Sequence, residues 1–134
     1  MVKSFSENMD KKASWRALQM WQVLIGCAHN QQLTTYGQLA EVMGDLQPRH
    51  LANILGRIMF WCEEEGLPPL TVLVVKSHGG SPGSGFDLDD SRYGNLDEAR
   101  MDVFKADWYR IVPPTADEFQ QVWERAKAAG RTSS

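Results

Sequence analysis

The sequence predicts an α+β fold that is mostly helical, and three observations support this fold class. Apolar residues recur at steps of three and four along several segments, which is the period of an amphipathic helix. Thr35 with Gln38, and Thr115 with Glu118, have the S/T-x-x-E/Q spacing of a capping box at a helix start. Residues 70–76 form one apolar, β-branched run, which predicts a short buried strand.

Three helices are expected in the first half of the chain. The first is expected over residues 12–29, with an apolar stripe of Trp15, Leu18, Trp21, Ile25 and Ala28. A short second helix is expected over 34–44, capped by Thr35 and stopped by Gly44. The third is expected over 48–65, because Pro48 suits a first helical turn and Gly66 suits an end.

The second half continues from the strand at 70–76 into a long glycine-rich loop over 77–94. A fourth helix is expected to start near Asn95. Residues 105–114 are interpreted as the end of that helix followed by a short strand. The capping box at Thr115 then predicts a last amphipathic helix.

Length and composition predict a single globular domain. The chain has 134 residues, enough for one sizeable core, and we expect the domain over 11–129 with disordered ends at 1–10 and 130–134. No apolar run approaches the roughly 20 residues of a membrane helix, and the N-terminus has no apolar signal-peptide core. We therefore expect a cytoplasmic protein without a membrane partner.

The net charge and the two cysteines bear on the possible partners and on disulfide formation. The net charge is −3, which neither demands nor excludes nucleic acid. Cys27 and Cys62 are far apart and form no C-x-x-C pattern, so no disulfide framework is expected. Both lie among apolar residues of predicted helices, where a free cysteine is usually buried and inert.

The glycine-rich loop does not have the pattern of a phosphate-binding loop. Its "GGSPGSGF" is followed by Asp87, Asp89 and Asp90, which would repel a phosphate, and no Lys-Ser/Thr pair opens a helix. His78 with the three aspartates does not have calcium-loop spacing, and a solvated acidic turn is the simpler interpretation. We expect no metal and no cofactor.

Two large aromatic residues, Phe60 and Trp61, are neighbours in the third predicted helix. Consecutive residues point in different directions on a helix, so one of the two is expected to leave the apolar face. A partner surface is conceivable at that position.

Part of the chain resembles the winged-helix DNA-binding domain of the alkylguanine-DNA alkyltransferases and alkyltransferase-like proteins. Residues 35–40, Thr-Tyr-Gly-Gln-Leu-Ala, match the opening motif of that domain, and residues 53–59, Asn-Ile-Leu-Gly-Arg-Ile-Met, are similar to its recognition helix. Pro68 and Pro69 stand where the family has a proline-containing loop. Over residues 15–80, the resemblance implies a winged-helix-like helix-turn-helix core with a short sheet and flanking helices.

The same resemblance implies that the chain is not an enzyme. The Pro-Cys-His-Arg motif of the family falls near residues 73–77, and the cysteine position holds Val74 or Val75. No thiol is present there to accept an alkyl group. Asn53 occupies the place of the family's arginine that fills the gap left by a flipped base, whereas Tyr36 matches a residue that helps to rotate the nucleotide.

The function expected from these observations is non-enzymatic binding of double-stranded DNA, or association with it, by a winged-helix protein. The candidate contact residues are Tyr36, Arg49, His50, Asn53 and Arg57. The alternative is a protein-interaction adaptor on the same scaffold, which the acidic balance favours. A small enzyme at the glycine-rich loop is the third possibility.

Overall fold

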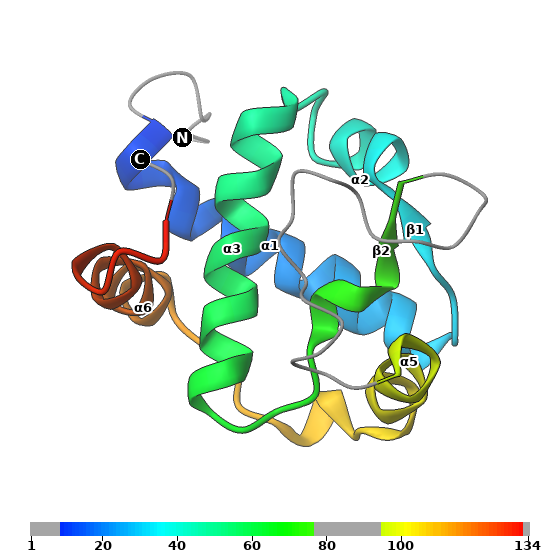
Figure 1. Cartoon of the computed structure of the whole chain (residues 1–134). Helices are drawn as coiled ribbons and strands as arrows, with labels where there is room; N and C mark the ends of the chain where they lie inside the picture. The colour runs from blue at the N-terminus through cyan, green and yellow to red at the C-terminus, as the bar shows by residue number, and fades with distance from the viewer. Residues whose placement is uncertain (1–8, 77–94, 133–134) are drawn as a thin grey trace.

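The computed structural model describes residues 9–76 and 95–132 and confirms a mostly helical α+β fold (Figure 1). Its elements in chain order are α1 (Met9–His29), β1 (Thr34–Thr35), α2 (Tyr36–Val42), α3 (Pro48–Glu64), the 3₁₀-helix η1 (Leu70–Leu73), β2 (Val74–Val75), α5 (Leu96–Lys105), the 3₁₀-helix η2 (Trp108–Arg110) and α6 (Ala116–Ala128). None of the described helices is long and apolar enough to cross a membrane.

The helix boundaries follow the capping chemistry that the sequence predicts. The Thr35 and Thr115 hydroxyls each accept a hydrogen bond from the backbone N–H three positions on, and the Gln38 and Glu118 side chains accept from the backbone N–H of the cap residue. The Asn95 side chain caps α5 by accepting from the Asp97 amide at 2.8 Å. These three helix starts are therefore confirmed.

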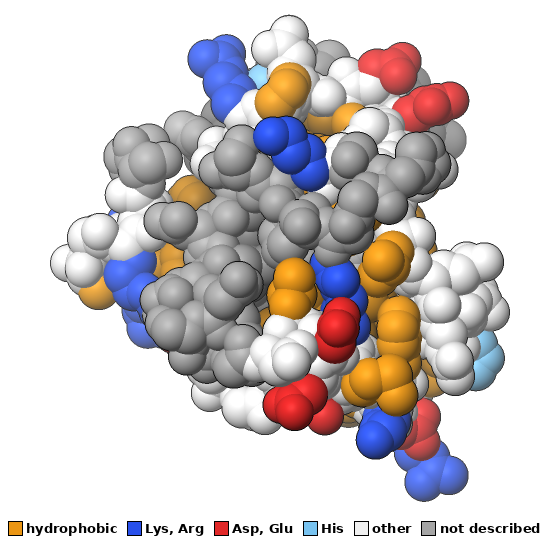
Figure 2. Space-filling view, turned by 45° about the vertical axis from the view of Figure 1, so that its right-hand side comes forward, with side chains coloured by type: hydrophobic (Ala, Val, Ile, Leu, Met, Phe, Trp, Pro, Cys, Tyr) orange, Lys and Arg blue, Asp and Glu red, His pale blue; other side chains and the backbone are white. Residues whose placement is uncertain are grey.

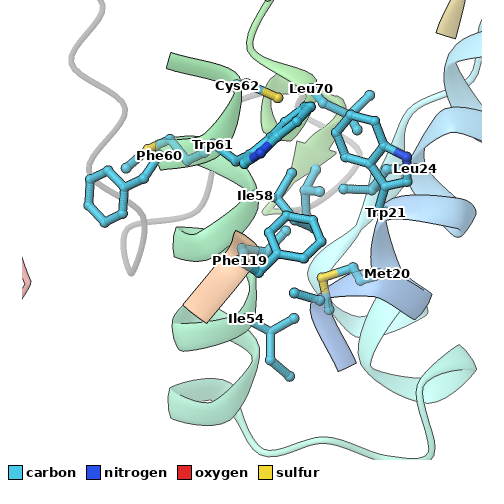
Figure 3. Packing of buried hydrophobic residues seen from close by; sticks show 14 of the residues in the cluster. Met20, Trp21, Leu24, Ile54, Ile58, Phe60, Trp61, Cys62, Leu70 and Phe119 are labelled. Carbon is cyan, nitrogen blue, oxygen red and sulfur yellow. The ribbon is translucent and has the colours of Figure 1, made fainter. Parts of the chain in front are cut away.

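The core lies where α1, α3 and α6 pack against one another, with α3 upright between the other elements in Figure 1. Trp21 is fully buried at its centre, with ring centroids 5.3 Å from Trp61, 5.5 Å from Trp108 and 6.4 Å from Phe119. Figure 3 shows the rings of Trp21, Trp61 and Phe119 beside aliphatic side chains between the helices. Edge-to-face contacts of this kind add to the burial energy of large aromatic residues.

Of Phe60 and Trp61, one does point away from the face that packs on α1, as expected, but neither is open to a partner, because both are buried. Trp61 faces Trp21, whereas Phe60 points the other way (Figure 3) and packs 6.0 Å from the ring of Trp123 in α6. The Arg131 guanidinium covers Phe60 at 4.7 Å and pairs with Glu63. α6 and the segment after it therefore occupy the side of α3 that the sequence left open for a partner.

The predicted strand at 70–76 is only partly present. Residues 70–73 form η1, with the Val72 amide bonded to the Pro69 carbonyl at 3.0 Å, and only Val74 and Val75 are extended. All of these residues are buried. A run that is covered on every side is apolar at each position, so its sequence shows no hydrophobic period that would distinguish a strand from a 3₁₀-helix. The strand expected within 105–114 is also wrong. This stretch contains η2, held by a 2.7 Å bond from Trp108 Nε1 to the Val103 carbonyl.

β1 and β2 pair in parallel, with Thr34 opposite Val74 and Thr35 opposite Val75. Because β1 runs directly into α2, this pairing fixes the start of α2 beside the end of β2. The first helix begins earlier than expected, since α1 starts at Met9 rather than near residue 12. The glycine-rich loop, with His78, Asp87, Asp89 and Asp90, lies outside the described residues.

Candidate nucleic-acid interface

The start of α3 is the only part of that helix, apart from its acidic end, that reaches the surface. Every residue from Ile54 to Cys62 is buried, because α1 and α6 pack on different sides of the helix. Arg49 is exposed, and His50 and Asn53 are half-buried. The accessible part of α3 is therefore its first turn and a half.

The first turn of α3 begins at the surface, although Pro48 has no N–H and the His50 amide already donates to the Gln47 carbonyl at 3.0 Å. Pro48 stands in the first turn, the Gln47 side chain makes no capping bond, and no acidic residue lies in that turn. The first backbone N–H groups of a helix carry partial positive charge and favour negative groups. Arg49 adds a full positive charge at the same place.

Arg57 does not belong to this surface, although the sequence predicts it as a candidate contact residue, because its side chain is buried. The side chain is only 2% exposed, donates from Nε to Ser14 Oγ at 2.9 Å and from Nη1 to the Asn53 carbonyl at 3.0 Å, and lies 4.3 Å from the centroid of the Trp123 ring. Eight helical residues turn the side chain about 80° away from Arg49. That rotation carries it under α6.

The residues around Arg57 make it part of the core rather than of a binding site. Ser14, which accepts from Arg57, donates to Gln120 Oε1 at 2.7 Å, so the polar chain joins α1, α3 and α6. Gly56 lets Trp123 approach, because a Cβ at that position would lie 2.7 Å from Trp123 Cζ3. The signal that could have revealed this is the Gly56-Arg57 pair inside an otherwise apolar helix.

Tyr36 begins α2 and is half-buried against the core. The sheet register brings a residue near it that the sequence did not suggest. Thr35 pairs with Val75 in parallel strands. The next residue on one strand is Tyr36 and the next on the other is the exposed Lys76, so the two residues are neighbours. Only the register of β1 and β2 reveals Lys76, since its position in the sequence carries no binding motif.

The charges at this end of the molecule are mixed. Arg49 and Lys76 are exposed, but so are Glu41 in α2 and Asp45 in the turn before α3. Figure 2 likewise shows basic and acidic side chains close together at the upper end of the molecule, where α3 starts. A duplex would therefore contact local basic groups and not a continuous positive stripe.

The two cysteines lie in environments that keep their thiols protonated. Burial raises the pKa of the Cys62 thiol to about 12 and also raises the pKa of the half-buried Cys27 thiol, so both are protonated at neutral pH. Val74 and Val75, which hold the alkyltransferase cysteine position in the predicted alignment, are buried in β2. Within residues 9–76 and 95–132, no three His, Cys, Asp or Glu residues are grouped so as to hold a metal ion.

Comparisons of the chain with protein-family models, with curated proteins and with solved structures gave no match in any of the three.

Proposed function

We propose that the chain binds double-stranded DNA without catalysing a reaction on it, with α2 and α3 as a winged-helix-like helix-turn-helix unit. The observation that carries this proposal is the start of α3, which presents the exposed Arg49 and the half-buried His50 after an N-cap residue without a side-chain capping bond, while residues 54–62 lie in the core. Helix-turn-helix proteins contact base edges with the N-terminal residues of their second helix, and the first helix crosses the phosphate backbone.

The proposed contacts follow from where the side chains lie. Arg49 meets a phosphate or a guanine, because a guanidinium donates two parallel hydrogen bonds to either group. Asn53, half-buried one turn further on, reaches a base edge only if α3 enters the groove end-on. Tyr36 and Lys76 contact the phosphate backbone of the DNA beside the start of α2.

The experiment is a fluorescence-anisotropy titration of short duplexes at two salt concentrations. Arg49→Ala is expected to weaken duplex binding and to lower the salt slope by about one unit, because one phosphate contact is lost. The matched control is Arg110→Ala, which removes another exposed arginine, in η2, away from the start of α3. Equal losses in the two variants would refute the proposed surface, and absence of wild-type binding at low salt would refute DNA binding.

The alternative, a protein-interaction adaptor on the same scaffold, has one observation in its favour. Met101, Tyr109 and Val112 are 50%, 62% and 84% exposed, and they lie in or near α5 and η2. Exposed apolar side chains favour a protein partner where they form a continuous patch. If the wild-type chain binds no duplex at low salt, the adaptor function replaces DNA binding.

A further inference from the structure

Two shallow hollows flank Val42 on the face formed by α1, β1 and α2. One has a volume of about 760 Å³ and the other about 480 Å³, and Val42 lines both. The first is lined by Cys27, Gln32, Leu33, Thr34, Gln38, Glu41 and Val42, and the second by Arg16, Gln19, Gln22, Val23, Val42 and Met43. We call these residues the Val42 face.

The Val42 face has the composition of an interface core. Val42 is 66% exposed and Leu33 is 40% exposed, although both are aliphatic. Four glutamines supply neutral donors and acceptors, and only Arg16 and Glu41 are charged. Depletion of charged residues is the compositional mark of the central part of a protein–protein interface.

The two charges are placed so that the face complements itself. Arg16 lines one hollow and Glu41 lines the other, with Val42 common to both. Arg16 is held in its hollow by a bond from Nη2 to the Met43 carbonyl. In a two-fold dimer, the axis lies in the plane of contact, and each side of the face meets the opposite side of the same face on the other copy. Opposite charges on the two sides therefore come against each other.

We propose that the Val42 face joins two copies of this chain about a two-fold axis through Val42. Val42 packs against the partner's Val42, and Arg16 lies against the partner's Glu41 on both sides of the axis. The glutamines hydrogen-bond across the rim. This association does not depend on DNA binding, so the two proposals are tested separately.

The test is sedimentation equilibrium of the full chain at protein concentrations up to roughly 1 mM, where weak complexes are populated. The wild type is expected to rise from the 15.1 kDa monomer to twice that mass. Val42→Asp is expected to weaken association at least about tenfold, because the axis places two carboxylates face to face. The matched control is Val112→Asp, which places the same charge at a residue that is 84% exposed outside the Val42 face, and it is expected to dimerise like the wild type.

A charge exchange tests the geometry without altering Val42. Glu41→Arg and Arg16→Glu are each expected to associate more weakly than the wild type, whereas an equimolar mixture of the two restores dimers by pairing opposite charges on both sides of the axis. Far-ultraviolet circular dichroism establishes that each variant is folded. A wild type that stays monomeric throughout, equal effects of Val42→Asp and Val112→Asp, or no recovery in the mixture of folded variants would each overturn the proposal.

Discussion

The Cys62 thiol illustrates how burial of one residue couples to pH. Burial raises the pKa of this thiol to about 12, and a hydrogen bond with the Leu70 backbone offsets only part of that effect. In the unfolded chain the pKa returns to the ordinary value of 9.0. Above pH 9 the unfolded state therefore releases a proton that the folded state keeps, and stability falls as pH rises from about 9 toward 12.

We expect the free energy of unfolding of the wild type to fall relative to that of Cys62→Ala above pH 9. One pH unit beyond 9.0 corresponds to about 1.4 kcal/mol for this group. Urea denaturation of both proteins at about pH 7, 8, 9 and 10 measures the difference, and the contribution of Cys27 cancels between them. A difference that stays constant across this range would show that the thiol is not buried as described.

Arg49 and Arg57 show that one residue type occupies opposite environments little more than two turns apart on a helix. Arg49 is exposed at the start of α3, whereas Arg57 is 2% exposed and bonded to Ser14 and the Asn53 carbonyl. Burying a charge is costly unless hydrogen bonds satisfy it, and the contacts of Arg57 reduce that cost. Arg57 therefore contributes to the packing of α1, α3 and α6 rather than to a binding surface.

At the scale of single elements, the cap of α2 is the most direct link from sequence to stability. The Thr35 hydroxyl accepts from the Gln38 amide at 3.0 Å. Thr35→Ala is expected to cost about 1 kcal/mol, whereas Thr35→Ser keeps the hydroxyl and is expected to change stability by only a few tenths. The midpoints and slopes of urea denaturation measure both effects. If the two variants are equally destabilised, the hydroxyl does not cap the helix.

Two helical glycines predict effects of opposite sign. Gly56→Ala places a methyl group 2.7 Å from Trp123 Cζ3, so α3 and α6 must separate at a cost of about 1–3 kcal/mol. Gly26→Ala in α1 meets Tyr109 Oη at 3.7 Å, an ordinary contact, and is expected to stabilise the protein by roughly 0.5–1 kcal/mol. Thermal denaturation of the two variants side by side gives the signs. Stabilisation by Gly56→Ala would contradict the close approach of α6.

For the whole molecule, the sequence predicts helices well because their boundaries depend on local chemistry. The caps at Thr35, Asn95 and Thr115 act within three residues, so they can be read without knowledge of the fold. Residues 70–73 could not be assigned in this way, because their environment is made by α1, α3 and α5. Their conformation depends on neighbours that are distant in the sequence.

The candidate site also has a part that local sequence predicts and a part that depends on the tertiary structure. The exposed start of α3 could be predicted, since Pro48 marks a first turn and first turns are usually accessible. The burial of Arg57 could not, because it depends on α6 reaching back over α3 from the end of the chain. Lys76 was missed for a related reason, as only the parallel register of β1 and β2 brings it near α2.

Helix α3 runs without a break from an exposed start into a fully buried middle. Binding of a ligand at its start is therefore coupled to the folding of the whole chain. A ligand held at Pro48–Asn53 contacts the same helix that carries the core residues Ile54 to Cys62, so the contact surface is lost whenever the chain unfolds. A ligand that binds only the folded chain, at a free concentration of 100 times its Kd, adds about 2.7 kcal/mol to the free energy of unfolding. A rise in melting temperature thus reports binding to the folded chain for any ligand, whether or not its chemistry is known in advance, and its loss in Arg49→Ala assigns the binding to this site.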